Sequence, residues 1–233
     1  AQLMSSIKRR HFLQFAGSTL AAMGLSQTDF LSQATRYSQA AAQTPARKLA
    51  LLIGINDYSG NDSAADLRGC LTDVDLQYEL LVNRFGFDPG NIVRITDKQP
   101  LKPTRKNILK TFRSHLIDQA EPGDVVVFHY SGHGSYVFDP DPVYEGFELN
   151  GTIMPSDPVA EGSDLVPDIM GRTLFLLMRA IRTDNVTAIL DSCHSGGGLR
   201  GNSVVRAVNR SGGRAMPEEF ELQARLLEEA NLS

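Results

Sequence analysis

The chain has few cysteines, little net charge and no long apolar segment. Two cysteines, Cys70 and Cys193, stand among 233 residues, too few for a disulfide framework. No stretch approaches the roughly 20 consecutive apolar residues that cross a bilayer, which predicts no stable membrane insertion. A formal net charge of -4 argues against nucleic acid or an anionic membrane as a partner. With 42% hydrophobic and 21% charged residues, the composition is typical of a soluble globular protein.

Residues 1–46 differ from the rest and carry a pattern typical of an export signal. The paired arginines Arg9 and Arg10 precede a weakly apolar segment, Phe15–Leu25, and small residues follow at Ala40–Ala42. This order resembles a twin-arginine signal with a following linker. We therefore predict export by the twin-arginine route to a bacterial periplasm or an equivalent compartment. The alternative is an extension that is retained on a cytoplasmic protein.

Residues 47–200 alternate between apolar runs typical of strands and segments with apolar residues at helical spacing. Such alternation predicts an α/β domain with a mainly parallel sheet flanked by helices. A long segment rich in Asp, Pro and Gly, Ser135–Pro167, is expected to be a functional loop. The expected strands are Lys48–Ile55, Asn91–Thr96, Asp124–Ser131 and Asn185–Asp191, and the expected helices are Cys70–Phe85, Thr104–Gln119 and Met170–Arg182.

Two polar motifs, His129–Gly134 and Asp191–Gly196, each follow a strand-like apolar run. The carboxyl ends of parallel strands lie at one edge of a sheet, where α/β folds carry their reactive groups. A thiol needs an imidazole to lower its pKa or to take its proton, so Cys193 is the expected nucleophile and His133 its expected base. The backbone amides of Gly134 and Cys193 are the expected oxyanion hole.

Three other histidines are interpreted as structural or exposed. His129 is expected to point into the core from its strand, and His115 to be exposed on its helix. His194 is expected to be structural or to face solvent, because neighbouring side chains on an irregular turn diverge. A redox pairing of Cys70 with Cys193 is an alternative that no Cys-x-x-Cys motif supports.

Four motifs follow one another along the chain: Ala50–Asn56, Leu67–Asp73, His129–Gly134 and Asp191–Gly196. In these motifs the chain resembles the caspase-like large subunit (p20) of the metacaspase family, including the bacterial members called orthocaspases. The resemblance implies a three-layer caspase-like sandwich over residues 47–200 and a cysteine endopeptidase that cleaves proteins or peptides after Arg or Lys.

The resemblance also implies a pocket for the basic side chain of the substrate, formed by Cys70, Asp73, Ser131 and Asp191. Two carboxylates in one cleft bind a guanidinium group and repel an aspartate side chain. Asp191 precedes Cys193 by two residues and so faces the same side of the strand end. Considered by itself, Asp73 is also typical of an acidic residue at a helix start, which the helix dipole favours.

The chain departs from the family at positions that bind calcium in many metacaspases. Where the family pattern has paired aspartates, this chain has Asp168 followed by Ile169, and Arg200 stands where a further aspartate is expected. A hard divalent cation needs several oxygen ligands and disfavours arginine. We therefore predict that the protein holds no metal or other cofactor and that its activity is independent of calcium.

Residues 201–233 are expected to form an arginine-containing linker and a short charged helix, Glu218–Glu229. No strand pattern typical of a caspase small subunit (p10) follows Arg214. The chain is therefore either a large-subunit-only member or one that uses a separate small subunit. The linker lies where a caspase-like zymogen is cut, and the candidate self-processing sites are Arg200, Arg206, Arg210 and Arg214.

Two alternatives to a metacaspase peptidase stay open. A gingipain- or clostripain-type Arg-specific cysteine peptidase would use nearly the same residues, although the motif around Cys193 favours the metacaspase. A caspase-like fold that serves as an inactive scaffold or binding module would explain the lack of small-subunit strands. The presence of both Cys193 and His133 argues against this second alternative, because an inactive module needs neither residue.

Overall fold

The structure is a computed structural model that describes residues 46–61, 64–142, 148–192 and 213–230. The chain divides into two units, Ala1–Ala46 and Arg47–Ser233, and every helix and strand below belongs to the second. The predicted export signal lies outside the described residues, as do Cys193, His194, Arg200, Arg206 and Arg210. In the described part of the chain, no helix has the length and apolar character needed to cross a membrane.

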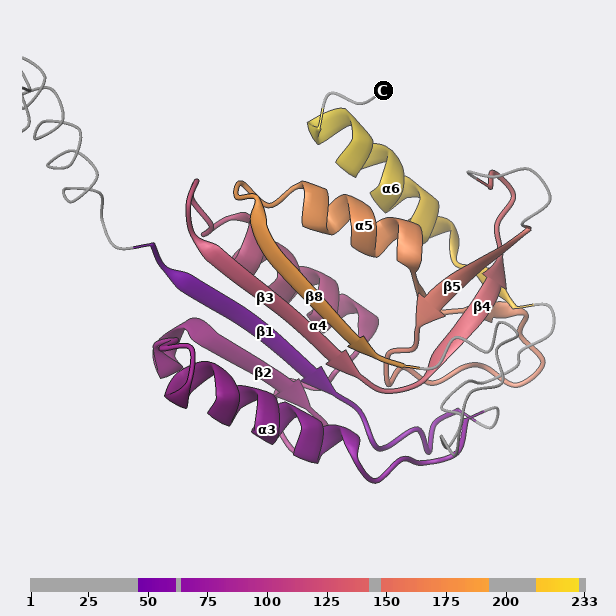
Figure 1. The fold of residues 1–233 in the computed structure, drawn as a ribbon. Coiled ribbons are helices and arrows are strands. Elements are labelled where there is room, and N and C mark those ends of the chain that lie inside the picture. Colours follow the sequence, from indigo (N-terminus) through magenta and orange to yellow (C-terminus); the bar gives the residue numbers. More distant parts are fainter. Residues whose placement is uncertain (1–45, 62–63, 143–147, 193–212, 231–233) are drawn as a thin grey trace, which may run out of the picture. The chain divides into compact units, whose positions relative to one another are not determined.

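A four-stranded parallel sheet forms the centre of the domain, in the order β2-β1-β3-β8 (Figure 1). The central strands β1 and β3 are buried almost throughout, which explains why both are continuous apolar runs. Ser131 lies opposite Asp191 in the β3–β8 register, so the two motif-bearing strands end side by side. The strands are β1 (Lys48–Gly54), β2 (Ile92–Thr96), β3 (Val125–Ser131) and β8 (Asn185–Asp191).

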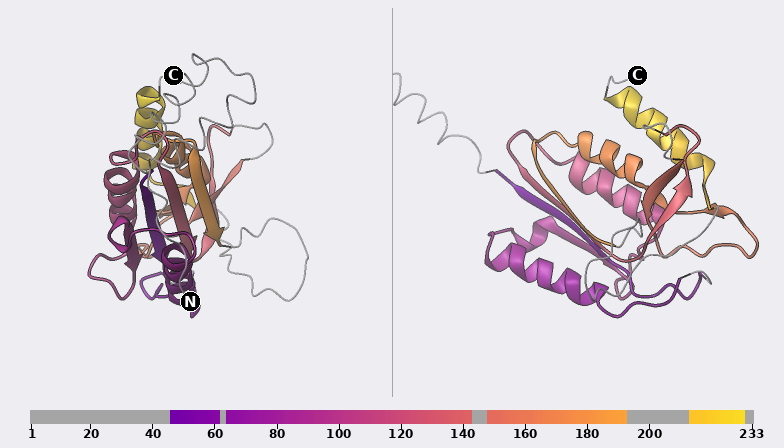
Figure 2. Two further views of the ribbon diagram at one scale, coloured as in Figure 1. Left: turned by 60° about the vertical axis from the view of Figure 1, so that its left-hand side comes forward. Right: turned by 45° about the vertical axis from the view of Figure 1, so that its right-hand side comes forward.

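Helices cover both faces of this sheet and give the domain three layers (Figure 2). Helix α3 packs on one face, where its apolar side chains join Leu52 and Val127. The other face is covered by α4, η2 and α5, and α6 packs beside α5. The predicted α/β fold with a mainly parallel sheet between helices is confirmed. The helices are α3 (Cys70–Asn83), η1 (Pro89–Asn91), α4 (Arg105–Thr111), η2 (Phe112–Ile117), α5 (Gly171–Arg179) and α6 (Pro217–Glu229).

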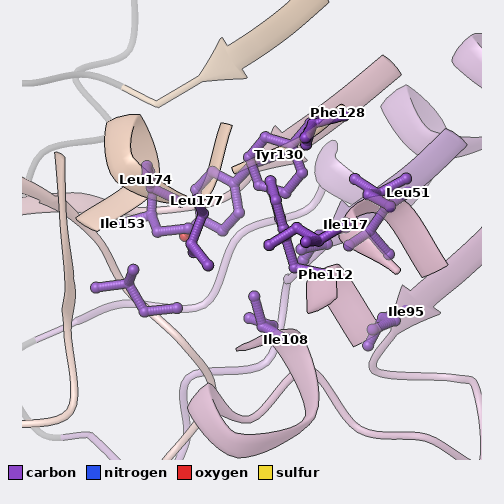
Figure 3. Close-up of a cluster of buried hydrophobic side chains, with 14 of the residues drawn as sticks. Leu51, Ile95, Ile108, Phe112, Ile117, Phe128, Tyr130, Ile153, Leu174 and Leu177 are labelled. Carbon is purple, nitrogen blue, oxygen red and sulfur yellow. The ribbon is translucent and has the colours of Figure 1, made fainter. Parts of the chain in front are cut away.

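The larger hydrophobic core lies on the α4 and α5 side of the sheet (Figure 3). Phe112 of η2 packs on Phe128 of β3 with ring centroids 5.2 Å apart, and both rings are buried. Full burial of one such side chain contributes about 1.5–3 kcal/mol. Side chains alternate across a strand, so with Phe128 and Tyr130 in this core, His129 and Ser131 face α3.

A second sheet of five short strands follows β3, in the order β6-β9-β4-β5-β7. Strands β4 and β5 form an antiparallel pair, and all of their residues except Gly134 belong to the segment Ser135–Pro167, for which the sequence predicts a loop. That expectation is wrong because the strands are short and are separated by stretches rich in Asp, Pro and Gly, so no apolar run marks them. The strands are β4 (Gly134–Phe138), β5 (Leu149–Ile153), β6 (Leu165–Val166), β7 (Ile169–Met170) and β9 (Arg214–Ala215).

The segment expected as one helix, Thr104–Gln119, divides into α4 and the π-helical η2. Thr104 caps α4 as predicted, since its hydroxyl accepts a hydrogen bond from Asn107 N. The wider π-helical winding changes which side chains face inward, and His115 Nε2 lies 3.0 Å from Asn91 O. The prediction that His115 is exposed is therefore wrong, because only 7% of it is accessible.

The C-terminal helix α6 carries a buried carboxylate that bonds to the rest of the domain. Glu219 accepts hydrogen bonds from Met170 N at 2.7 Å and Thr173 Oγ1 at 2.5 Å, and it forms an ion pair with Arg105. The predicted helix Glu218–Glu229 is confirmed. The strand β9 that precedes it was not predicted, because two residues are too few to produce a strand pattern.

Candidate active site

His133 lies in the turn between β3 and β4, at the carboxyl end of the parallel sheet. Gly132 makes the turn possible: a Cβ there would lie 2.5 Å from the hydroxyl oxygen of Tyr130 and 2.7 Å from that of Tyr58. A side chain at this position would displace one hydroxyl or both, so glycine allows the close approach of the backbone. His133 itself is buried.

A backbone oxygen orients the imidazole of His133. Nε2 lies 2.7 Å from the carbonyl oxygen of Ala65. Because a carbonyl oxygen only accepts, Nε2 carries the proton of the neutral ring, and Nδ1 is its basic nitrogen. Ala65 O thus fixes the tautomer, as a carboxylate does in a catalytic triad. Sequence could not identify this group, because a backbone oxygen has no residue-type signature.

Two buried tyrosines hold the backbone on both sides of His133. Tyr58 Oη accepts a hydrogen bond from His133 N at 2.9 Å, and the two rings pack with centroids 4.7 Å apart. Tyr130 Oη lies 2.7 Å from His133 O and 2.8 Å from Met154 O. Burial raises the pKa of both phenols, so they stay neutral donors and acceptors at any physiological pH.

Three of the four predicted pocket residues, Asp73, Ser131 and Asp191, come together on the α3 side of this sheet end. Ser131 Oγ donates a hydrogen bond to Asp73 Oδ2 at 2.7 Å, and Ser131 is the register partner of Asp191. Asp73 and Asp191 both line a cavity of about 340 Å³ between α3 and β8. Two carboxylates on one cavity make it selective for a cation.

The fourth predicted residue, Cys70, does not line this cavity. It is fully buried as the first residue of α3, and its backbone N–H donates to Asn56 Oδ1 at 3.0 Å. A Cβ at Gly54 would lie 2.7 Å from Cys70 O, so α3 begins in close contact with the end of β1. The Asn56 side chain thus holds the first residue of the helix that carries Asp73 one turn later.

The predicted nucleophile, Cys193, lies outside the described residues. It follows Asp191 by two positions, as His133 follows Ser131. Gly134, expected to supply one oxyanion-hole amide, is the first residue of β4. The pairing of Cys193 with His133 and the oxyanion hole therefore stay predictions.

A further histidine borders the same cavity. His129 is buried, as predicted, but it lines the cavity together with Asp73 and Asp191. Burial lowers the pKa of His129 below its usual range, against the raising influence of the two carboxylates. Its position two residues before Ser131, on the same face of β3, is a signal that sequence offered. The other lining residues are Leu76, Gln77, Leu80 and Ile189.

Among the described residues, no group of three or more His, Cys, Asp or Glu side chains is arranged to hold a metal ion. Asp168, which stands where the family pattern has paired aspartates, is buried. Its Oδ2 accepts a hydrogen bond from Thr152 Oγ1 at 2.7 Å. This carboxylate therefore contributes to the packing of β5 against the segment before β7.

A parallel sheet between helices, with a histidine and an acidic cavity at the carboxyl ends of its strands, defines an α/β domain of the caspase-like class. The solved structure of the protein GSU0716 from Geobacter sulfurreducens shares the fold, with a TM-score of 0.52 and 22% identity. The match covers 78% of this chain and 62% of that one.

Comparison with families identifies the chain further. The family described as metacaspase, peptidase C14 domain, matches residues 48–200. Metacaspase-1 of Eremothecium gossypii is 37% identical over 167 residues, which cover 68% of this chain and 34% of that protein. The chain belongs to the metacaspase family.

Two other relatives have similar coverage. Metacaspase-1 of Schizosaccharomyces pombe is 38% identical over 162 residues, 66% of this chain and 35% of its own length. Metacaspase-4 of Arabidopsis thaliana is 39% identical over 152 residues, 64% of this chain and 34% of its own length. The chain thus spans about a third of the length of these curated relatives.

Proposed function

We propose that this chain is the catalytic domain of a cysteine endopeptidase that cleaves after Arg or Lys. One observation carries the proposal: an oriented histidine and an acidic cavity share one end of the sheet. His133 has its basic nitrogen defined by Ala65 O, and Asp73 and Asp191 line the cavity. A prepared base and a cation-selective pocket are what such a peptidase requires.

In the proposed mechanism, Cys193 Sγ attacks the carbonyl carbon of the substrate while its proton passes to Nδ1 of His133. The backbone amides of Gly134 and Cys193 stabilise the negative oxygen that forms. The C–N bond then breaks, His133 gives the proton to the leaving amine, and a thioester remains. A water molecule that transfers its proton to His133 hydrolyses the thioester and restores the thiol.

The proposed specificity follows from the charge of the cavity. An arginine side chain of the substrate binds the carboxylates of Asp73 and Asp191 through paired hydrogen bonds, whereas lysine binds them as a compact charge. A substrate aspartate would meet two like charges. The hydrogen bond from Ser131 orients Asp73, and the hydrogen bond from Cys70 N to Asn56 Oδ1 holds the start of its helix.

Calcium-independent activity is part of the proposal. Arg200 replaces an expected acidic ligand, and the Asp168 carboxylate already accepts a hydrogen bond from Thr152. We expect equal rates of arginine-peptide hydrolysis in calcium and in a chelator. An enzyme that is silent in the chelator and active in micromolar calcium would contradict this part.

We also propose self-processing within the linker. Arg200, Arg206 and Arg210 are the favoured sites. Arg214 lies in β9, where its backbone N–H donates to Asp164 O at 2.7 Å, so cleavage after it requires β9 to open. Mass spectrometry should find Arg-terminated fragments in the wild type and none in Cys193→Ala; identical masses would contradict self-processing.

A cut in the linker should not release the C-terminal piece. Helix α6 is held by the buried pair of Glu219 with Arg105, and Leu226 packs in the main core. We therefore expect the cleaved protein to elute from a sizing column as one species. Separation of the two fragments without denaturant would contradict this expectation.

The proposed protein partner is a caspase-type small subunit. Among the described residues, β8 pairs only with β3, so its other edge is open. Leu190 on β8 is 43% exposed and Phe175 on α5 is 58% exposed, and strand addition to β8 would cover both. Co-expression with such a subunit should yield a stable complex, and Leu190→Lys should weaken it.

The open edge of β8 also favours a second candidate, a caspase-like binding module without activity. A covalent probe with an arginine side chain separates the two, because only a peptidase labels at Cys193. The gingipain or clostripain alternative has no such support, since the chain belongs to the metacaspase family.

Export by the twin-arginine route is the proposed localisation. Replacing both Arg9 and Arg10 with lysine should keep the protein in the cytoplasm, as measured by cell fractionation. Unchanged distribution would favour the cytoplasmic alternative.

The test of the main proposal is hydrolysis of peptides with Arg, Lys or Asp before the scissile bond. Cleavage after Arg or Lys that disappears in Cys193→Ala would support the reaction, its nucleophile and the acidic pocket together. Cleavage after Asp, or activity that survives in Cys193→Ala, would contradict it.

A further inference from the structure

The mechanism above leaves one buried histidine without a role. His129 is 2% exposed, and neither of its ring nitrogens has a hydrogen-bond partner among the described residues. Buried polar atoms in proteins are almost always paired, and leaving one unpaired costs about 1–3 kcal/mol. An unpaired imidazole at the wall of a cavity therefore points to a ligand that supplies the missing partner.

The surroundings of His129 define what that ligand must be. Helix α3 contributes Asp73 and Gln77 to the cavity, and β8 contributes Asp191. On the other side of β3, the register partner of His129 is the apolar Leu52 of β1. Among the described residues that pack on it, the charged groups that face His129 are thus two carboxylates, and they favour a cation.

The protonation state of His129 fits a cationic ligand. Burial outweighs the two carboxylates and lowers the pKa of the imidazole, so the ring is neutral at pH 7. A neutral imidazole has one nitrogen that accepts a hydrogen bond. The cavity therefore offers two negative charges and one neutral acceptor, all suited to N–H donors that carry positive charge.

We propose that His129 is a specificity-determining residue, whose imidazole accepts a hydrogen bond from the guanidinium group of the substrate inside this cavity. The inference rests on the proposed function and extends it. A guanidinium spreads five N–H donors over three nitrogens in a plane, so it can bind a carboxylate through two hydrogen bonds while another nitrogen reaches the imidazole; an ammonium has three donors on one compact nitrogen. His129 thus favours arginine over lysine.

A pH effect follows from the same contact. A protonated His129 has no acceptor and repels the bound cation, so affinity for arginine substrates falls as the ring becomes charged. In His129→Asn the amide oxygen still accepts a hydrogen bond but does not titrate. The rise of KM toward acid pH should therefore be smaller in His129→Asn than in the wild type.

The experiment compares steady-state kinetics of the wild type, His129→Leu and His129→Asn on arginine and lysine peptides. We expect KM for the arginine peptide to rise about tenfold in His129→Leu, the effect of one hydrogen bond to a charged group, with a smaller rise for the lysine peptide. We expect kcat to be nearly unchanged and His129→Asn to retain most of the affinity. His115→Leu is the matched control, since it removes a buried imidazole remote from the cavity.

Two further measurements separate binding from chemistry and folding. Alkylation of Cys193 by the uncharged reagent iodoacetamide should proceed at the wild-type rate in His129→Leu, because the nucleophile is untouched. Addition of N-acetyl-argininamide to otherwise intact Cys193→Ala should shift the imidazole resonances of His129 in the NMR spectrum. This second readout requires no variant of His129 and is unaffected if His129→Leu fails to fold.

The outcomes distinguish this inference from the proposed function. If the wild type cleaves after arginine and KM is the same in His129→Leu, or kcat falls without KM, the inference is overturned and the proposed function stands. Unshifted His129 resonances at saturating N-acetyl-argininamide also overturn it. If the wild type cleaves no basic peptide, the proposed function fails and the inference fails with it.

Discussion

Replacing Tyr58 with phenylalanine tests how the backbone around His133 is held. The Tyr58 hydroxyl accepts a hydrogen bond from His133 N at 2.9 Å and lies 3.1 Å from Met154 O. Without the hydroxyl, the buried N–H of His133 loses this acceptor. Met154 O keeps its contact with Tyr130 Oη at 2.8 Å. The substitution therefore removes the acceptor of His133 N and leaves the contact between Tyr130 and Met154 in place.

The expected loss of stability follows from the one buried N–H group that loses its acceptor. A buried donor that loses its acceptor costs about 1–3 kcal/mol. A loss of about 2 kcal/mol lowers the melting temperature of a chain of this size by roughly 4–8 °C. We also expect kcat to fall by about tenfold, because a shift of the His133 backbone misaligns Nδ1. KM should be nearly unchanged, since Tyr58 does not line the acidic cavity.

Thermal unfolding and steady-state hydrolysis of an arginine peptide measure the two effects. Tyr78→Phe is the matched control: Tyr78 lies on α3, and its ring packs against the Arg94 guanidinium at 4.4 Å, a contact that needs no hydroxyl. A melting temperature and a kcat at wild-type values in Tyr58→Phe would refute the reasoning. Equal losses in both variants would show that the effect is not specific to the His133 backbone.

Three further predictions concern charged side chains. Asp73→Asn should lower kcat/KM for arginine peptides at least about tenfold without slowing alkylation of the nucleophile; unchanged kcat/KM would contradict the acidic pocket. Glu219→Ala should destabilise the domain by about 3–5 kcal/mol in denaturant unfolding, because it leaves the buried Arg105 uncompensated; a loss below about 1 kcal/mol would contradict this reading. The pKa of Asp124 is lowered, since burial raises it but two backbone amides and the Arg47 guanidinium lower it more. A lowered carboxyl pKa stabilises the fold above the unfolded value and loses this effect as the pH falls through the folded value. Asp124→Asn should therefore be less stable than the wild type near pH 7, and the difference should shrink below pH 3.8; a difference that grows at acid pH would contradict it.

The parts of the fold that sequence predicted are those whose signal is local. The apolar runs of β1 and β3 and the helical spacing of α3 reflect burial of the residues themselves. The second sheet escaped prediction because β6, β7 and β9 have two residues each. His115 was misplaced because a π-helical turn departs from the regular spacing on which the prediction relied.

The same distinction applies to the candidate site. Asp73, Ser131 and Asp191 could be named because motifs carry them, and the β3–β8 register and one hydrogen bond join them. For His129 the sequence offers only its position two residues before Ser131, on the same face of β3. Its burial follows from its strand, but the cavity that it borders lies between α3 and β8, two elements whose packing the sequence does not specify.

By itself, the amino-acid sequence determined the parallel sheet, the residue types of the candidate chemistry and the end of the sheet where they gather, because hydrophobic periodicity and motif order are properties of neighbouring residues. Only the tertiary structure decided which groups hold the functional and the buried polar side chains in place. The partner of His133 Nε2 is the backbone oxygen of Ala65, and the partner of Glu219 is Arg105, 114 residues away. Such contacts depend on distances between segments that chain spacing does not specify, and a backbone atom is the same in every residue.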